Sequence, residues 1–267
     1  MKTLNICSQP SHSNRKRGRT AIMGVLNVTP DSFYDGGRFF DIDRAVMHGL
    51  KLIEAGADML DIGGESTRPG SVSVDAKEEI DRVIPVIKLL GEMTDIPISV
   101  DTYKSEVAER AIKYGATMIN DISALRFDEN MADIVAEYDL PVCLMHMHGR
   151  PSDMQIHPVY NDIIQDIICF LKERIDFAVE KGISTDKIII DPGIGFGKRT
   201  GEGIDDNCTI LKRLKEFKSL NKPILVGTSR KTFISNLCNE PSPKDRLIGS
   251  LATIAVAVAN GADIVRV

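Results

Sequence analysis

The order of short apolar runs and longer helical segments constrains the fold of this chain more than any other feature. Eight apolar runs, rich in Ile, Val and Met, cover residues 21–27, 59–63, 97–101, 118–122, 141–147, 187–191, 223–229 and 263–267. Helical periodicity is found between them, at residues 41–56, 75–92, 104–114, 129–138, 162–181, 204–219 and 244–260. In segment 162–181, for example, apolar residues recur every three or four positions. This alternation predicts parallel strands joined by helices, in a protein of the α/β class.

Eight such units favour a (β/α)8 TIM barrel over an open doubly wound sheet, which remains the alternative. The length of 267 residues fits one barrel of this kind. We therefore expect an N-terminal polar and basic arm at residues 1–20, followed by a single barrel domain at residues 21–267. Active sites of barrels lie at the carboxyl ends of the strands, so the last residues of the apolar runs are the first candidates.

The composition excludes several classes of protein. Hydrophobic residues make up 43% of the chain, which is enough for a core and argues against disorder. The formal net charge of −5 argues against broad binding to nucleic acid, which needs clustered cations. The longest apolar run, at residues 251–259, is far shorter than the about 20 residues that span a bilayer.

The N-terminal region and the cysteines indicate where the protein works. The N-terminal segment has no apolar region of the kind found in secretory signals. The five cysteines are scattered and include no CxxC pair, which suits a reducing compartment. We therefore expect a cytoplasmic protein that binds small molecules, and neither nucleic acid nor a membrane.

Nearly every apolar run ends in a polar or charged residue. Three of the runs follow similar Gly-Ala junctions, which places Asp61, Asn120 and Arg266 in one register late on their strands. One carboxylate alone could simply cap the next helix. Several carboxylates converging in a partly buried mouth would be costly without partners, so the set predicts a ligand that carries hydrogen-bond donors and positive character. The set comprises Asn27, Asp61, Asp101, Asn120, His146 or Met147, Asp191, Ser229 and Arg266.

Two long polar segments follow the first two runs. Residues 28–38 and 63–72 are rich in Gly, Pro and Ser, which suits a lid, although such segments can also be plain connections. Thr67 and Arg68 could bind an anion there, as could Arg266 and the neighbouring pair Arg230 and Lys231. A phosphate-bearing substrate is therefore expected.

Two further motifs admit alternative readings. Residues 191–198 form a Gly-rich segment that matches neither a Walker motif nor a dinucleotide fingerprint. We interpret it as a turn that brings Phe196 and the backbone close to a flat ligand. His146 and His148 form an HxH pair, which binds zinc in other barrels, but no third ligand is obvious.

These segments together resemble the dihydropteroate synthase family, from about residue 20 to the end of the chain. The first two motifs are long and specific. The matching motifs lie at residues 23–33, 61–70, 99–102, 120–122, 144–147, 191–193, 195–198, 229–231 and 266–267.

The resemblance implies a (β/α)8 barrel that joins 6-hydroxymethyl-7,8-dihydropterin pyrophosphate to p-aminobenzoate, giving 7,8-dihydropteroate and pyrophosphate. It implies Mg²⁺ as the cofactor, a homodimer built on late barrel helices, and a reaction through an ionised pterin cation. It also implies roles for individual residues. The pterin would be bound by Asp101, Asn120, Ile122, Met145, Asp191, Gly195, Phe196 and Lys231.

The other expected roles follow from the same resemblance. The catalytic residues would be Asp35, Asn27, Lys231 and Arg68, with Asp35 stabilising the cation. Pyrophosphate would be held by Asn27, Thr67, Arg68 and Arg266, with Asn27 also beside the metal. The p-aminobenzoate would be bound by Thr67, Arg68, Pro69, Phe196, Ser229 and Lys231.

Three other functions stay open at this point. One is a related barrel that binds corrinoid and methyltetrahydrofolate, another is a non-catalytic binding barrel, and the third is a zinc hydrolase using His146 and His148. Family members also continue past the Arg-Val pair with a histidine and a last helix. The given sequence ends at Val267, so we expect the native protein to be longer.

Overall fold

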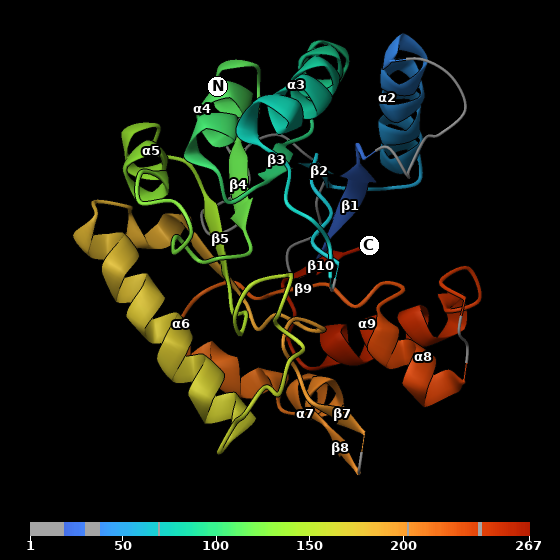
Figure 1. Cartoon of the computed structure of the whole chain (residues 1–267), viewed down its shortest axis with the longest axis vertical. Helices are drawn as coiled ribbons and strands as arrows, with labels where there is room; N and C mark the ends of the chain where they lie inside the picture. Colours follow the sequence, from blue (N-terminus) through green and yellow to red (C-terminus); the bar gives the residue numbers. More distant parts are fainter. Residues whose placement is uncertain (1–18, 30–37, 69, 202, 240–241) are drawn as a thin grey trace.

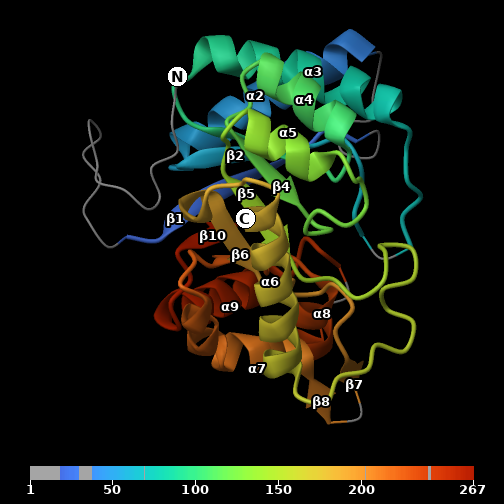
Figure 2. The same ribbon diagram turned by 90° about the vertical axis from the view of Figure 1, so that its left-hand side faces the viewer.

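Eight parallel strands form a barrel at the centre of the fold, with the helices around it (Figures 1 and 2). The structure is a computed structural model that describes residues 19–29, 38–68, 70–201, 203–239 and 242–267. Asp35, Pro69 and most of the predicted N-terminal arm lie outside the described residues, so the arm stays a prediction. The strands of the barrel are β1 (Ala21–Asn27), β2 (Met59–Gly63), β3 (Ile98–Asp101), β4 (Met118–Asp121), β5 (Val142–Met145), β6 (Ile188–Asp191), β9 (Leu225–Val226) and β10 (Ile264–Arg266).

The pairing of the strands distinguishes a barrel from an open sheet. The hydrogen-bonded order is β6-β5-β4-β3-β2-β1-β10-β9, and every pair is parallel. The two ends of this order meet at a parallel bridge between Ile190 and Ile224, where Ile190 N donates to Pro223 O at 3.0 Å. The predicted barrel is therefore confirmed over the open sheet.

The helices pack on the outer faces of the strands. The apolar side chains between helices and strands form the largest hydrophobic cluster among the described residues. Three of the helices begin at aspartate caps: Asp75 accepts from Glu78 N before α3, Asp162 accepts from Ile164 N and Gln165 N before α6, and Asp205 accepts from Cys208 N before α7. The helices are α2 (Arg38–Glu54), α3 (Ala76–Met93), α4 (Ser105–Lys113), α5 (Met131–Glu137), α6 (Ile163–Glu180), α7 (Asp206–Lys212), α8 (Thr232–Cys238) and α9 (Leu247–Ala259).

The chain departs from the expected elements in its last third. Segment 204–219 was expected to be one helix, but it holds a short strand, α7 and the 3-10 helix η2 (Leu214–Leu220). Leu214 and Phe217 are both buried, and a 3-10 turn aligns residues three apart better than an α-helix does. The run at 223–229 is a strand only at Leu225–Val226, since the chain then turns and Lys231 N donates to Thr228 O at 3.2 Å.

Four small elements were not expected from the sequence. The helix α8 follows the turn at residues 228–231. The strands β7 (Thr200–Gly201) and β8 (Ile204–Asp205) form an antiparallel hairpin, and the 3-10 helix η1 (Thr185–Lys187) precedes β6. None of them changes the order of strands in the barrel.

The inside of the barrel is arranged in two levels. The floor cluster is a set of apolar side chains from seven strands: Met23, Met59, Met118, Cys143, Ile189, Leu225 and Ile264. Side chains two positions later on a strand point to the same face, here toward the carboxyl end of the barrel. This second set, which we call the mouth layer, comprises Asp61, Asp101, Asn120, Met145, Asp191 and Arg266. Successive inward-facing side chains of one strand therefore belong first to the apolar floor cluster and then to the mainly polar mouth layer.

Candidate active site

Arg266 connects three residues of the mouth layer. Its Nε donates to Asp61 Oδ2 at 2.6 Å, and its Nη2 donates to Asp101 Oδ2 at 2.6 Å. Asn120 Nδ2 donates to the same oxygen of Asp61 at 3.0 Å. The register expected for Asp61, Asn120 and Arg266 is thus confirmed. These side chains come from β2, β4 and β10, which are separated from one another in the sheet by β3 and β1, and the curvature of the barrel turns them toward one another.

One guanidinium between two buried carboxylates leaves this site rich in acceptors. Burial raises the pKa of Asp101 to about 7, against the lowering effect of Arg266 and with a further rise from the charge of Asp61. Within the described part of the chain, Asp61 Oδ1 and Asp101 Oδ1 are buried and have no hydrogen-bond partner. Buried polar atoms are nearly always satisfied, so these two oxygens point to a ligand with N–H donors.

Asp191 and Lys231 form the opposite side of the mouth. Asp191 Oδ1 accepts from Gly193 N at 2.7 Å. Burial raises the pKa of Asp191, while the charge of Lys231 opposes the rise. Lys231 Nζ donates to Ile194 O at 2.5 Å and lies 4.7 Å from the centroid of the Phe196 ring. Burial lowers the pKa of Lys231 to about 8, although Asp191 works in the other direction.

An apolar wall lies beside these charges. Its buried members are Ile122, Met145, Met147 and Met154, with Tyr103, Phe127 and Phe196 packed against them. Methionine adapts its shape and contacts aromatic rings through a polarisable sulfur. Charged groups on two sides, next to such an apolar wall, suit a flat heteroaromatic ring.

The segment after β2 is anchored at its start by a buried ionic cluster. Lys104 Nζ donates to Glu65 Oε2 and to Glu79 Oε2, both at 2.5 Å. Tyr103 OH donates to Glu65 Oε1 at 2.7 Å, and Gly70 N donates to Pro151 O at 3.1 Å. Burial raises the pKa of Glu79, which Lys104 opposes. Further along this segment, Thr67 is half-buried and Arg68 is exposed.

The structure brings most of the expected residues to the same end of the barrel. Asp101, Asn120, Met145, Asp191 and Arg266 belong to the mouth layer, and Phe196 and Lys231 flank it. Other expected residues lie nearby on the strand ends and loops: Asn27 is exposed, Ser229 and Gly195 are half-buried, and Ile122 is buried.

Two residues gain importance that the resemblance did not give them. Asp61 accepts from both Asn120 and Arg266, and its place among the strand-end residues was the signal that could have indicated it. Lys198 is buried beneath the Gly-rich turn with a pKa lowered by burial to about 7. Its position in a GxxxGK-like segment gave no indication that it is buried.

The zinc reading of the HxH pair finds no support in the surroundings of His146. The Nδ1 atom of His146 lies 3.1 Å from Lys198 Nζ, and the pKa of the ring is lowered by burial and by this cation. Among the described residues, no group of three His, Cys, Asp or Glu side chains could hold a metal ion. The ammonium of Lys198 would also repel a zinc ion at this position.

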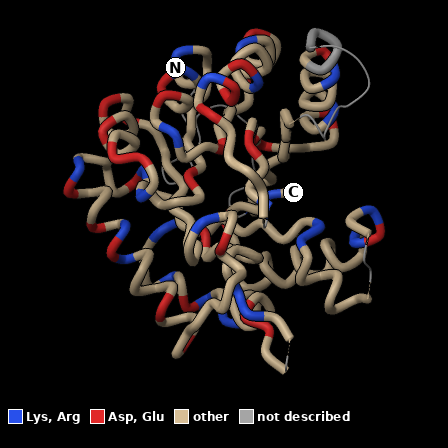
Figure 3. The backbone as a smooth tube through the Cα atoms, viewed as in Figure 1, with Lys and Arg blue, Asp and Glu red and all other residues tan. Residues whose placement is uncertain are grey.

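The outer surface carries charges of both signs. Lys and Arg alternate with Asp and Glu along the helices rather than forming one basic face (Figure 3). No helix in the part of the chain that the structure describes is both long and apolar enough to cross a membrane.

Comparison with known proteins identifies the same family from a family model and from related sequences. A family model described as pterin binding enzyme matches residues 23–267. A dihydropteroate synthase from Synechocystis sp. is 45% identical over 249 residues, which cover 93% of this chain and 85% of that protein.

Two solved structures have the same fold. The dihydropteroate synthase of Xanthomonas albilineans with 4-aminobenzoic acid is 46% identical with a TM-score of 0.87, and the match covers 93% of this chain and 87% of that one. The dihydropteroate synthase of Yersinia pestis in complex with a sulfonamide drug is 44% identical with a TM-score of 0.86, and the match covers 94% and 89%.

Proposed function

Because this chain belongs to the pterin-binding enzyme family, we propose that it joins 6-hydroxymethyl-7,8-dihydropterin pyrophosphate to p-aminobenzoate. Its activity is that of a dihydropteroate synthase, a transferase of folate biosynthesis. The observation that carries this proposal is the pair of buried, partnerless oxygens on Asp61 and Asp101. A pterin ring carries a row of N–H donors that such acceptors would satisfy.

The pterin would lie between the mouth layer and the apolar wall. The carboxylates of Asp101 and Asp191 would accept from its N–H groups, and Asn120 would pair with an edge that mixes donors and acceptors. Lys231 would donate to the ring carbonyl. Contact with the flat faces would come from Ile122, Met145, Gly195 and Phe196.

The leaving pyrophosphate would lie toward the opening, beside the cations. Arg266 uses Nε and Nη2 for its carboxylate partners, and a guanidinium has five donors, so further N–H groups can face a phosphate. Thr67, Arg68 and Asn27 would complete this subsite. Fixed donors aimed at charge that develops on the leaving group lower the barrier most.

The residues at the mouth fit a magnesium ion of modest protein coordination. Asn27 ends β1 in an exposed position and has a side-chain carbonyl, a hard oxygen of the type that Mg²⁺ accepts. Mg²⁺ usually keeps several waters and is held by substrate phosphates with one or two protein groups. When bound, it would neutralise charge on the departing pyrophosphate.

The p-aminobenzoate would enter after the pterin, under the segment that follows β2. It would be surrounded by Thr67, Arg68, Pro69, Phe196, Ser229 and Lys231. Asp35 would stabilise the pterin cation, which the amine of p-aminobenzoate attacks. The amine of p-aminobenzoate is neutral at pH 7, so no strong base is needed. This agrees with a mouth layer that contains carboxylates and an amide but no histidine.

A homodimer is proposed from the exposed face of α9. Its apolar side chains are unusually open for a helix of a monomer, with Leu247 at 51%, Ile248 at 75% and Leu251 at 56% exposure. A second copy would cover them, as expected for late barrel helices in this family. We also propose a cytoplasmic location, which suits the free cysteines Cys143, Cys169, Cys208 and Cys238.

Turnover of the two substrates tests the proposed function directly. The protein, with Mg²⁺, should release pyrophosphate and form 7,8-dihydropteroate in equal amounts when it is given both substrates. The Asp191→Asn variant serves as the control for contaminating activity, because it replaces one accepting oxygen by an NH2 donor, which would face an N–H group of the pterin. Absence of product from the wild-type protein, or transfer of a methyl group to a corrinoid protein instead, would refute the assignment.

A further inference from the structure

Among the residues that the structure describes, Lys198 is the largest side chain that is almost completely buried, with an exposure of 2%. It stands at the end of the Gly-rich turn, residues 191–198, and none of the steps above uses it. Its Nζ donates to Gly193 O and to Phe196 O, both at 2.8 Å, and lies 3.1 Å from His146 Nδ1. An ammonium has three N–H donors, and each of them has an acceptor here.

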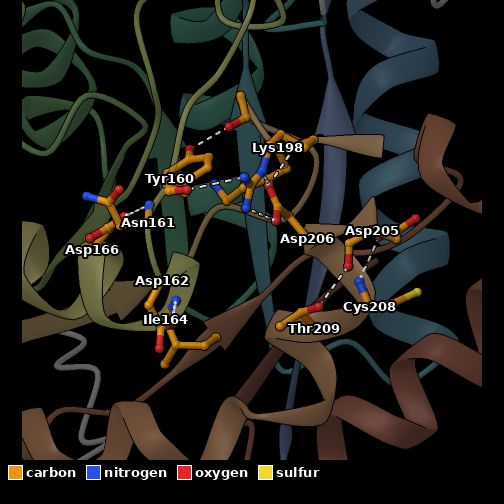
Figure 4. Close-up of polar contacts among 12 residues, drawn as sticks. Tyr160, Asn161, Asp162, Ile164, Asp166, Lys198, Asp205, Asp206, Cys208 and Thr209 are labelled. Atoms are coloured by element: carbon orange, nitrogen blue, oxygen red, sulfur yellow. Dashed lines mark hydrogen bonds and ion pairs between the residues drawn. The ribbon is translucent and has the colours of Figure 1, made fainter. Parts of the chain in front are cut away.

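The Gly-rich turn is held by side chains at five consecutive carbonyls, those of residues 193–197. Besides the two that Lys198 binds, Gly195 O accepts from Gln155 Nε2 at 2.9 Å, and Gly197 O accepts from Tyr160 OH at 2.5 Å. Figure 4 shows Tyr160, Lys198 and Asp206 close to one another. A turn without a strand or helix ladder depends on such donors for its shape.

The close packing at Gly193 shows how little room the turn has. Gly193 has a φ of +72°, and a Cβ built there would lie 1.8 Å from His146 O. His146 N in turn donates to Asp191 O at 2.9 Å. The end of β5 and the start of the turn are therefore in direct contact, with Lys198 Nζ joining both.

We propose that Lys198 is a positioning residue, whose Nζ ties the end of β5 to the Gly-rich turn and thereby sets Asp191 and Phe196 for the pterin. This inference rests on the proposed function, because it concerns the same pocket. Lys198 itself would touch no substrate. Its effect would pass through the carbonyls of Gly193 and Phe196.

The protonation of this tether agrees with its geometry. The groups that face Lys198 are Asp191 on β6, Asp206 on α7, Lys231 before α8 and His146 after β5. Burial lowers the pKa of Lys198 to about 7, and burial together with Lys198 lowers the pKa of His146 well below its ordinary value. The imidazole is therefore neutral near pH 7.

A neutral imidazole can serve either protonation state of Lys198. Its Nδ1 accepts a hydrogen bond when Lys198 is an ammonium. When Lys198 is an amine, the other tautomer can donate from Nδ1–H to the lone pair, while the amine keeps both carbonyl bonds. The tether would thus persist on both sides of neutral pH, and the tautomer of His146 would report on the proton of Lys198.

Kinetics of Lys198→Met test the tether, since methionine fills the space of lysine without the ammonium. We expect KM for the pterin substrate and for p-aminobenzoate to rise at least tenfold. The matched control is Ile167→Ala on α6, which removes fully buried side-chain volume from the large apolar cluster under the helices and not from the apolar wall or the mouth layer. The control should lower the melting temperature and leave both KM values within twofold of the wild type. Wild-type KM values in a folded Lys198→Met variant would overturn the proposal.

Two further measurements keep the proposal testable if Lys198→Met does not fold. Lys198→Gln keeps a hydrogen-bond donor on a shorter side chain. It should raise both KM values, but by less than Lys198→Met. In the wild-type protein, nitrogen NMR should show His146 as a neutral imidazole from pH 5.5 to 9, because burial and Lys198 lower its pKa well below the ordinary value. Protonation of both ring nitrogens with a midpoint near the ordinary value of 6.5 would overturn the tether, because an imidazolium has no free Nδ1 to accept from Lys198. This NMR result does not depend on turnover, so it separates a failed tether from a failed assignment of function.

Discussion

Replacing Asp101 by asparagine should stabilise the fold in a strongly pH-dependent way. The pKa of this buried carboxyl is raised from an ordinary value of 3.8 to about 7, chiefly by burial. The folded protein therefore prefers the neutral acid, and the carboxylate destabilises the fold. This cost is absent below pH 3.8, grows as the pH rises, and is complete above about pH 7.

The size of the effect follows from that difference in pKa. Ionisation of Asp101 costs the fold about 4 kcal/mol at pH 8 but only about 1 kcal/mol at pH 4.5. Asparagine has no charge, so Asp101→Asn removes both costs and adds a pH-independent change in its bond with Arg266. The gain in unfolding free energy should therefore be about 3 kcal/mol larger at pH 8 than at pH 4.5.

Urea unfolding of both proteins at the two pH values measures this difference. Titrating groups that lie away from Asp101 are common to the two proteins and cancel in the comparison. The control is Asp176→Asn, which changes an exposed carboxylate on α6 and should shift the unfolding free energy by less than about 0.5 kcal/mol at either pH. A gain from Asp101→Asn that is equal at pH 4.5 and pH 8 would refute the argument from burial.

Three further predictions concern binding and the segment after β2. Asp191→Ala should weaken binding of the pterin substrate in calorimetry by about 1–3 kcal/mol, because ring donors lose their acceptor; near-normal affinity would refute that role. Arg68→Ala should raise KM for p-aminobenzoate more than KM for the pterin, and steady-state constants equal to those of the wild type would count against a lid. Lys104→Met should lower the unfolding free energy by about 3–5 kcal/mol, because Glu65 and Glu79 would lose the buried cation that they share. Tyr103→Phe, which removes one hydrogen bond to Glu65, should cost only about 1 kcal/mol, and equal losses for the two variants would contradict this account.

The sequence was informative where position along a strand determines the direction of a side chain. Asp61, Asn120 and Arg266 follow similar junctions, so a repeated βα unit brings them to the same level, and their hydrogen bonds confirm it. Asp101 and Asp191 end their strands in the same way. The period of two in a strand and the parallel register of the units are enough for this inference.

The sequence was less informative where tertiary contacts override local pattern. Segment 204–219 has helical periodicity, but that pattern cannot distinguish an α-helix from the 3-10 turn that buries Leu214 with Phe217. The burial of Lys198 could not be predicted from the sequence either, because lysine is rarely buried. Only the folded chain shows the carbonyls of Gly193 and Phe196 meeting at its Nζ.

The division of the barrel interior explains why the same strands can carry both stability and binding. The floor cluster is apolar, so burying it stabilises the fold. The mouth layer, two residues later, holds buried carboxylates that cost stability and are only partly compensated by Arg266. A ligand with N–H donors would supply the missing hydrogen-bond partners. Ligand binding should therefore offset the cost of burying these carboxylates and stabilise the folded protein. This predicts that substitutions in the mouth layer separate the two properties, whereas substitutions in the floor cluster impair both.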